Sequence, residues 1–269
     1  MRIDHAAMTH QGRRKSNEDA HCVEPRFGLF AVADGMGGYE GGEVASRLVV
    51  GTLAELFRQN CTESEGGEGG EGGERTWPYG MKAELGFLEN LLDVAVRTAN
   101  REVVARKHGA LAHMGSTVAA LAVRGREVVV AHVGDSRVYR LRDGRLGQLT
   151  RDHSLYAEME AAGSSGLPHR RDFPWRNVIT RAIGMSDARC DMLRDQLRAG
   201  DVYLLCTDGL LETVEEADIA GVLGSQAPEE ACRTLVNAAF TLGGRDNITA
   251  VVVRVLPCSA LATARHSAI

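Results

Sequence analysis

The stretch from Ala31 to Gly38, Ala-Val-Ala-Asp-Gly-Met-Gly-Gly, constrains the fold of this chain more than any other segment. The apolar run Leu29–Ala33 is typical of a buried strand, and it places the carboxylate of Asp34 at the end of that strand. The glycines that follow let the backbone turn sharply and approach a ligand without a Cβ atom in the way. A carboxylate beside a bare backbone suits a hard cation, which takes side-chain and carbonyl oxygens together. On this segment alone, an ordinary glycine turn that contains an aspartate is the alternative.

The composition is that of a globular protein rather than a membrane or disulfide-rich one. Of the 269 residues, 44% are hydrophobic and 25% are charged, which is enough for a sizeable core. No apolar run approaches the ~18 residues that span a membrane, and Met1–His5 lacks the apolar segment of a signal peptide. The six cysteines form no Cys-x-x-Cys pair, and the nine histidines form no zinc signature. We therefore expect a cytoplasmic protein with reduced cysteines and no membrane partner.

The negative charge is concentrated in one segment. Residues 61–76 hold five Glu and one Arg, so they carry −4 of the net charge of −5. The rest of the chain is nearly neutral, which does not favour binding to nucleic acid. Three Gly-Gly-Glu repeats in this segment cannot bury enough apolar surface to offset their ordering entropy. We expect a disordered Gly/Glu insertion at residues 59–77, with an acidic docking segment as the alternative.

The remaining pattern predicts one α+β domain over residues 1–256, in which antiparallel strands are flanked by two pairs of helices. Short connectors at Gly125 and Gly134–Ser136 predict antiparallel neighbours. Residues 163–177 are rich in Gly, Pro and Arg and are expected to form a mobile surface flap, and residues 257–269 a loose tail. Strands are expected at 3–10, 21–24, 27–33, 116–124, 126–133, 137–141, 201–206 and 248–255, and helices from 41 to about 60 and at 81–108, 154–162, 215–223 and 228–242.

Three aspartates share one kind of environment, the boundary between an apolar strand and a turn. They are Asp34, Asp208 and Asp246, and Asp19 precedes a neighbouring strand. In an antiparallel sheet, the end of one strand and the start of the next lie at the same edge, so these side chains can converge. Converged carboxylates without Arg or Lys among them repel one another unless cations neutralise them. Oxygen ligands alone favour Mg²⁺ or Mn²⁺ over zinc, and two such ions ~3.5–4 Å apart form a hydrolytic site.

Five motifs in this chain resemble, in order and spacing, those of the metal-dependent protein phosphatases of the protein phosphatase 2C type. They are Asn17-Glu18-Asp19, Asp34-Gly35-Met36-Gly37-Gly38, Gly134-Asp135-Ser136-Arg137, Thr207-Asp208-Gly209 and Gly244-x-Asp246-Asn247-x-Thr249. The resemblance runs from about Ile3 to Val255, which is nearly the whole chain. It implies a four-layer α-β-β-α sandwich of two mostly antiparallel sheets flanked by helix pairs.

The resemblance also implies a role for each acidic residue at two or three Mn²⁺ or Mg²⁺ ions. Asp34 would bridge two ions, and the carbonyl group of Gly35 would complete the shell of one of them. Asp208 and Asp246 would hold the other ion. Glu18 and Asp19 would orient water around the ions. Asp135, together with Asp208, would hold the third ion that bacterial members of the family bind.

The implied reaction is direct hydrolysis of phosphoserine or phosphothreonine esters in proteins by a metal-bridged hydroxide, without a phosphoenzyme. Arg14 would bind the substrate phosphate through its fork of donors. Bacterial members usually oppose a Hanks-type serine/threonine kinase, so phosphorylated targets of such a kinase are the expected partners of a monomeric enzyme. The alternative is a catalytically silent regulator that binds a kinase or phosphoprotein, but silent members normally lose metal carboxylates and none is lost here.

Met36 marks a departure from the animal members of the family. Those carry His after Asp-Gly, where it has been assigned as the general acid, whereas Met cannot donate a proton. His21 and His153 are the nearest candidates in the sequence, but a structural role is expected for each, and we assign no general acid.

Overall fold

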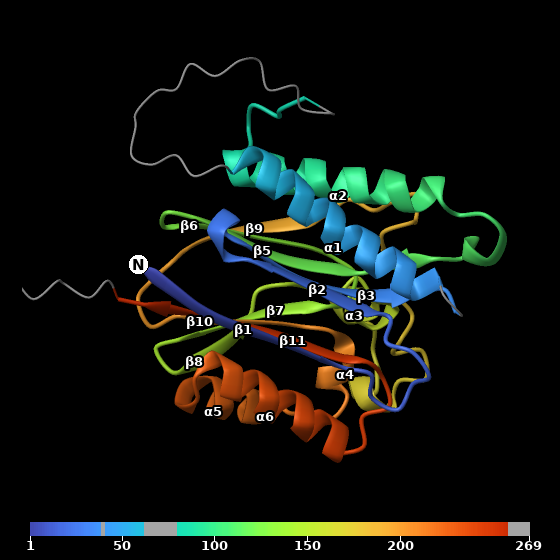
Figure 1. Cartoon of the computed structure of the whole chain (residues 1–269). Coiled ribbons are helices and arrows are strands. Elements are labelled where there is room, and N and C mark those ends of the chain that lie inside the picture. The colour runs from blue at the N-terminus through green and yellow to red at the C-terminus, as the bar shows by residue number, and fades with distance from the viewer. Residues whose placement is uncertain (39–40, 62–79, 258–269) are drawn as a thin grey trace, which may run out of the picture.

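Two antiparallel sheets pack face to face, and a pair of helices covers the outer face of each (Figure 1). The computed structural model describes residues 1–38, 41–61 and 80–257. The predicted α+β class and the four-layer sandwich are confirmed. Among the described residues, no helix is long and apolar enough to cross a membrane.

The first sheet has the strand order β1-β11-β10-β7-β8. Its strands are β1 (Arg2–His10), β7 (Arg137–Arg142), β8 (Arg145–Gln148), β10 (Val202–Cys206) and β11 (Ile248–Leu256). The central strands β10 and β11 are nearly continuous runs of apolar residues because both of their faces are covered. The edge strand β8 is mostly exposed and was not predicted.

The second sheet has the order β2-β3-β5-β6-β9, and a short strand β4 also pairs with β3. Its strands are β2 (Asp19–Glu24), β3 (Leu29–Met36), β4 (Gly115–Ser116), β5 (Val118–Arg124), β6 (Glu127–Val133) and β9 (Asp191–Gln196). Strand β9 was also missed by the sequence analysis. Its sequence, Asp-Met-Leu-Arg-Asp-Gln, is mostly charged or polar because it forms the exposed edge of the sheet.

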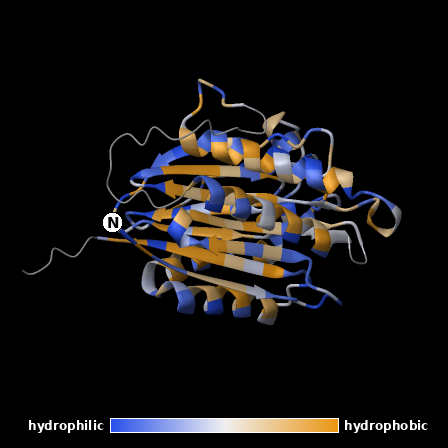
Figure 2. Cartoon of the chain, turned by 45° about the horizontal axis from the view of Figure 1, so that its top comes forward, coloured by the Kyte–Doolittle hydropathy of each residue, from blue (hydrophilic) through white to orange (hydrophobic). Residues whose placement is uncertain are grey.

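Helices α1 (Gly41–Asn60) and α2 (Phe87–Ala105) cover the second sheet, and α5 (Glu216–Ser225) and α6 (Pro228–Thr241) cover the first (Figure 1). Each presents an apolar stripe to its sheet, and hydrophobic residues of both sheets pack against one another between them. Figure 2 shows that the strands of both sheets are largely hydrophobic. Helix α2 is shorter at both ends than the predicted span of 81–108. Two further helices are short: α3 (Leu155–Ala161) and α4 (Asp208–Leu211).

The link Gly134–Ser136 does not join two hydrogen-bonded neighbours, contrary to the prediction. Strand β6 belongs to the second sheet and β7 to the first, so this link carries the chain from one layer to the other. Gly134 has a positive φ of 104°, and a Cβ atom on it would lie 2.6 Å from Cγ2 of Thr117. Only glycine fits this crossing, and the sequence does not reveal which sheet the next strand enters.

The flap at 163–177 contains one short 3-10 helix at Arg170–Asp172 and is anchored by Phe173, which is 3% exposed. Of the predicted insertion at 59–77, Gln59 and Asn60 end α1, and residues 62–77 lie outside the described residues. The predicted tail also lies outside them, apart from Pro257.

Candidate active site

Strands β2 and β3 bring two of the predicted carboxylates together. In their antiparallel register, Asp19 lies directly opposite Asp34. The backbone N–H of Gly35 donates to the carbonyl oxygen of Glu18 at 3.1 Å, which holds the segment before β2 against the end of β3. Three of the predicted metal-site residues therefore lie together: Glu18, which precedes β2, and Asp19 and Asp34 of the second sheet.

The first sheet contributes Asp208 and Asp246. Asp208 is the first residue of α4 and lies two residues after the end of β10, and Asp246 lies two residues before β11. A Cβ atom on Gly209 would lie 2.0 Å from the carbonyl oxygen of Asn247, so the two loops are in backbone contact. The aspartates thus converge across the interface between the two sheets. The prediction that they meet at the edge of a single sheet is wrong, although the convergence itself is present.

Hydrogen bonds at Asp19 connect the two sheets. Its Oδ2 accepts from the hydroxyl groups of Thr207 at 2.8 Å and Thr249 at 2.7 Å. Its Oδ1 is buried and has no hydrogen-bond partner among the described residues, and the same is true of Oδ1 of Asp208. Buried carboxylate oxygens normally have a partner, and a cation would supply one here. The donor set consists of oxygen atoms and fits Mg²⁺ or Mn²⁺.

The electrostatics of the acidic residues agree with a cation site. Burial raises the pKa of Asp34 well above its usual value, and repulsion from Asp19 and Asp208 adds to the effect. Burial likewise raises the pKa of Asp208, with repulsion from Asp246 as the next cause. In the absence of cations these carboxyl groups keep their protons to a higher pH than free carboxyl groups do, and divalent ions would compete with those protons.

The first turn of α1 packs against the same residues. A Cβ atom on Gly35 would lie 2.0 Å from the carbonyl oxygen of Gly42, and one on Gly42 would lie 1.9 Å from Oε2 of Glu18. The hydroxyl of Ser46 donates to the carbonyl oxygen of Glu18 at 2.5 Å. This close approach, which only glycines permit, fixes the position of the Glu18 carboxylate.

Asp135 lies in the link between β6 and β7 and is 2% exposed. Burial raises its pKa, and repulsion from Asp208 and Asp152 adds to the effect, whereas Arg170 acts in the opposite direction. Asp135 and Asp208 therefore interact electrostatically, as the predicted third-ion site requires.

Arg14, predicted to bind the substrate phosphate, lies at the margin of the acidic residues, and Arg170 of the flap acts on them as well. Nη2 of Arg14 lies 2.7 Å from Oδ2 of Asp246, and the Arg14 side chain is 58% exposed. This places its guanidinium at the rim of the site, where a phosphoryl group would enter. Arg170 of the flap forms an ion pair with Asp152 at 3.0 Å and acts on both Asp135 and Asp208.

Neither candidate histidine is placed as a free proton donor. Nδ1 of His153 accepts the N–H of Gly134 at 3.0 Å, and its Nε2 faces Asp191 at 3.3 Å. The ring stacks on His132 with 4.6 Å between centroids. Although His132, His153 and Asp191 lie close enough together to share an ion, Arg181 already pairs with Asp191 at 2.6 Å, so that position holds a cationic side chain. Burial lowers the pKa of His21, which lies in β2.

No role was predicted for Thr207, Thr249, Asp152 or Arg170. The threonines gave a usable signal, because a polar residue beside or within a run as apolar as β10 or β11 needs a buried hydrogen-bond partner. Arg170 gave none, since its place at the site depends on how the flap folds back.

Comparison with known proteins identifies the family. A sequence model described as protein phosphatase 2C matches residues 8–225. The chain is 34% identical over 257 residues to the serine/threonine protein phosphatase PstP of Mycobacterium tuberculosis (strain ATCC 25618 / H37Rv), with 94% of this chain and 45% of the relative covered. It is 32% identical over 253 residues to the serine/threonine phosphatase stp of Listeria innocua, with 91% and 93% covered. The chain thus spans about half the length of the mycobacterial relative.

Solved structures show the same likeness. The M. tuberculosis serine/threonine phosphatase PstP/Ppp superimposes with a TM-score of 0.80 at 33% identity, over 95% of this chain and 99% of that one. The catalytic domain of PstP in complex with two manganese ions gives a TM-score of 0.77 at 33% identity, with the same shares covered. The matched family model covers residues 8–225, which is most of the chain. The chain belongs to the protein phosphatase 2C family.

Proposed function

We propose that this chain hydrolyses phosphoserine and phosphothreonine esters in proteins, with Mn²⁺ or Mg²⁺ as its cofactor. The observation that carries the proposal is the convergence of Asp34, Asp208 and Asp246 from two sheets, where Oδ1 of Asp208 and of the neighbouring Asp19 are buried without a partner among the described residues. Divalent ions bound there would lower the pKa of a water molecule and offset the charge of the phosphoryl group. The activity named for the relatives and the two manganese ions in the PstP structure support the same function and cofactor.

Each acidic residue has a place in this proposal. Asp34 and the carbonyl oxygen of Gly35 lie where they would hold ions from the second sheet, and Asp208 and Asp246 would hold them from the first. Glu18 and Asp19 would orient water around these ligands, and Asp135 would hold a third ion with Asp208; their support is the closeness and burial described above.

Arg14 is the residue that we propose for binding the substrate phosphate. Its guanidinium already binds a carboxylate oxygen of Asp246, which shows that it reaches the acidic residues from the exposed side. When Asp246 holds a cation, the same donors become available to phosphoryl oxygens, which they fit in a two-pronged arrangement. No observation favours the catalytically silent alternative, because the chain keeps every carboxylate that the proposed metal site needs.

The test is Mn²⁺-dependent hydrolysis of a phosphothreonine peptide by the purified chain, compared with the variants Asp34→Asn and Asp208→Asn. We expect each variant to lose at least about a thousandfold in kcat, because its cation ligand is gone. Asp4→Asn, on the exposed N-terminal strand, is the matched control and should keep its activity. Near-normal turnover by Asp34→Asn would contradict the proposal.

The proposal extends to the cellular setting. We infer that the protein acts in the cytoplasm as a monomer on the targets of a Hanks-type serine/threonine kinase. Quantitative phosphoproteomics of a strain without this protein should show phosphorylation rising at a limited set of serine and threonine sites that the kinase modifies. Unchanged phosphorylation at the sites of every such kinase in the cell would contradict this part.

A further inference from the structure

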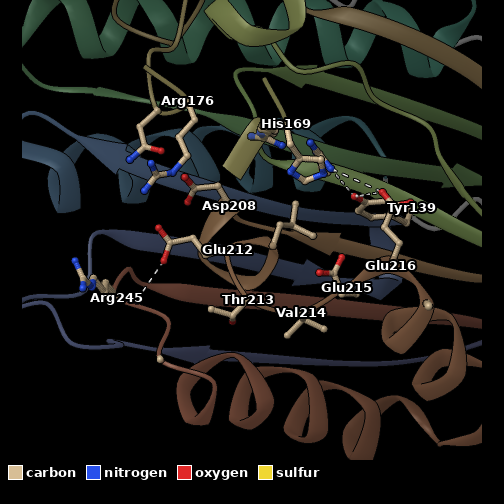
Figure 3. Close-up of a pocket in the computed structure, with 16 residues that line it drawn as sticks. Tyr139, His169, Arg176, Asp208, Glu212, Thr213, Val214, Glu215, Glu216 and Arg245 are labelled. Atoms are coloured by element: carbon tan, nitrogen blue, oxygen red, sulfur yellow. Dashed lines mark hydrogen bonds and ion pairs between the residues drawn. The ribbon is translucent and has the colours of Figure 1, made fainter. Parts of the chain in front are cut away.

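A cavity of about 900 Å³ opens beside Asp208, between the flap and the segment that connects α4 to α5 (Figure 3). One wall is formed by flap residues, among them His169, Arg170 and Arg176, and the opposite wall by residues 211–217. The volume is typical of ligand-binding sites. Asp208 lines the cavity and also belongs to the acidic site, so the cavity is a lateral extension of the candidate active site.

Two guanidinium groups at the Asp208 end of the cavity have no partner among the described residues. Arg176 lies on the flap, and Arg245 directly precedes Asp246. Both residues are exposed, and among the described residues neither side chain has a hydrogen-bond or ion-pair partner. Figure 3 shows the side chain of Arg176 extending from the flap toward the wall that carries Asp208 and Glu212.

The other arginines of the cavity are already paired. Arg137 binds both carboxylate oxygens of Asp152 at 2.8 Å, and Arg170 binds the same carboxylate at 3.0 Å. Arg176 and Arg245 are therefore the arginines of this cavity whose donors are available to a ligand.

The acidic side chains of the cavity are arranged differently. Oε2 of Glu212 accepts the backbone N–H of Arg245 at 3.2 Å, which partly satisfies its charge. At the opposite end, Oε1 of Glu216 accepts the hydroxyl of Tyr139 at 3.1 Å and lies 3.9 Å from Arg137 (Figure 3). Arg176 and Arg245 therefore bring cationic donors, unpaired among the described residues, to the end of the cavity that is lined by Asp208 and Glu212.

We propose, on the basis of the phosphatase activity proposed above, that this cavity binds the residues beside the phosphorylated side chain of the substrate. Arg176 and Arg245 form a subsite for an anionic side chain in that segment, either a carboxylate or a second phosphoryl group. Guanidinium groups bind both through paired donors, and complementary charge at such a subsite gives selectivity among substrates. Arg14, which pairs with Asp246, remains the group for the phosphoryl that is hydrolysed.

The experiment compares three phosphothreonine peptides, with neutral neighbours, with glutamates at the neighbouring positions, and with a second phosphoserine. For the unmodified chain with Mn²⁺, we expect kcat/KM to be about five- to tenfold higher for an anionic peptide than for the neutral one. The two anionic peptides distinguish a carboxylate from a phosphoryl group as the preferred ligand. In Arg176→Ala and Arg245→Ala, this ratio should fall, and in the double variant it should approach one. Arg233→Ala, on the exposed face of α6, is the matched control and should keep the full ratio.

A charge-reversal variant tests the proposal more strictly than the alanine variants do. Arg176→Glu should lose the preference for anionic peptides and favour a peptide with lysines at the same positions. Raising the salt concentration to about 0.5 M should shrink both preferences, because exposed charge pairs are screened. A ratio that stays unchanged in the double variant overturns the proposal. Equal losses on all peptides and on a small aryl phosphate also overturn it, since Arg176 would then bind the phosphoryl group under attack.

Equilibrium binding separates this inference from the proposed function. The same three peptides, with a phosphonate in place of the reacting phosphate ester, are titrated against the chain and its variants by fluorescence anisotropy. The ratio of their dissociation constants should follow the same pattern, whether or not the esters are turned over. Absence of Mn²⁺-dependent hydrolysis of any phosphate ester would contradict the proposed function alone, and equal binding of the three phosphonates would contradict the subsite alone.

Discussion

The hydroxyl of Thr249 donates a hydrogen bond to the carboxylate of Asp19 across the interface of the two sheets, with 2.7 Å between Oγ1 and Oδ2. Oγ1 of Thr9 lies 2.8 Å from that of Thr249 and accepts a hydrogen bond from the amide of Asn17 at 2.9 Å. Since Thr249 donates to Asp19, the hydroxyl of Thr9 donates to Thr249. This relay orients one oxygen of Asp19 and leaves the other, Oδ1, for a ligand.

Thr249→Val should weaken Mn²⁺ binding by about tenfold or more, because Asp19 loses a donor that orients it. Thr249→Ser keeps the hydroxyl and should restore the affinity. Isothermal titration with Mn²⁺ measures both variants, and Thr241→Val, at the exposed end of α6, serves as the control. Thr249→Val with the Mn²⁺ affinity of the unmodified chain would show that this hydrogen bond does not position Asp19.

Removal of metal should make stability fall as the pH rises. Burial raises the pKa values of Asp34 and Asp208 in the folded state, so the folded chain binds more protons than the unfolded chain above about pH 4. The stability that these groups contribute is therefore greatest below their unfolded pKa and is lost as the pH rises through the folded pKa. In a chelating buffer, the melting temperature should be lower at pH 8 than at pH 5.5, and Mn²⁺ should restore it at pH 8.

The variant Asp34→Asn isolates this effect, because an amide does not titrate. Its melting temperature in the chelating buffer should depend less on pH than that of the unmodified chain. Asp4→Asn, on the exposed strand β1, should keep the full dependence. A chain in chelator that is as stable at pH 8 as at pH 5.5, with or without Asp34, would contradict the assignment of these raised pKa values.

Gly42→Ala should impair the site although it lies in a helix, where alanine is usually favourable. The new Cβ atom would lie 1.9 Å from Oε2 of Glu18 and 2.8 Å from the carbonyl carbon of Gly35, so the carboxylate and the backbone must both shift. We expect kcat/KM to fall by about tenfold and the free energy of unfolding by about 1–3 kcal/mol. Gly51→Ala in the same helix meets no atom within 4 Å and should be neutral or stabilising by up to about 1 kcal/mol. Equal behaviour of the two variants in urea unfolding and in turnover would show that the close packing at Gly42 has no consequence.

Arg14→Ala should raise KM for a small aryl phosphate by about tenfold, because the guanidinium donors to the phosphoryl group are lost. Arg14→Lys should recover only part of this, since an ammonium group cannot form the two-pronged contact. The neighbouring Arg13, whose guanidinium lies over the ring of Phe240 at 5.9 Å, provides the control variant Arg13→Ala. Steady-state kinetics measure KM for all three variants. A normal KM in Arg14→Ala would remove Arg14 from the proposed site.

The sequence was sufficient to find the acidic residues, because an aspartate at the boundary between an apolar strand and a turn is a local pattern. Asp34, Asp208 and Asp246 each carry that pattern, and they do lie together. The interface at which they meet could not be predicted, since the three-residue link at Gly134–Ser136 reads the same whether it closes a hairpin or changes sheets.

Elements that lack an apolar pattern were missed for a different reason. Strand β9 is an edge strand whose side chains are mostly in contact with solvent, so the alternation that identifies a strand is weak. Arg170 reaches Asp152 only because the flap folds back over the site, and a contact between residues on a long loop leaves no local signal in the sequence.

The carboxylates come from both sheets, so the distance between the two sheets determines how far apart the carboxylates lie. Residues such as Phe30, Val32 and Leu205 fill the space between the sheets and set how far apart they stand. A smaller or larger side chain at one of these positions would move Asp34 relative to Asp208 without touching either. The packing of the interior thereby sets the spacing of the carboxylates that we propose as cation ligands.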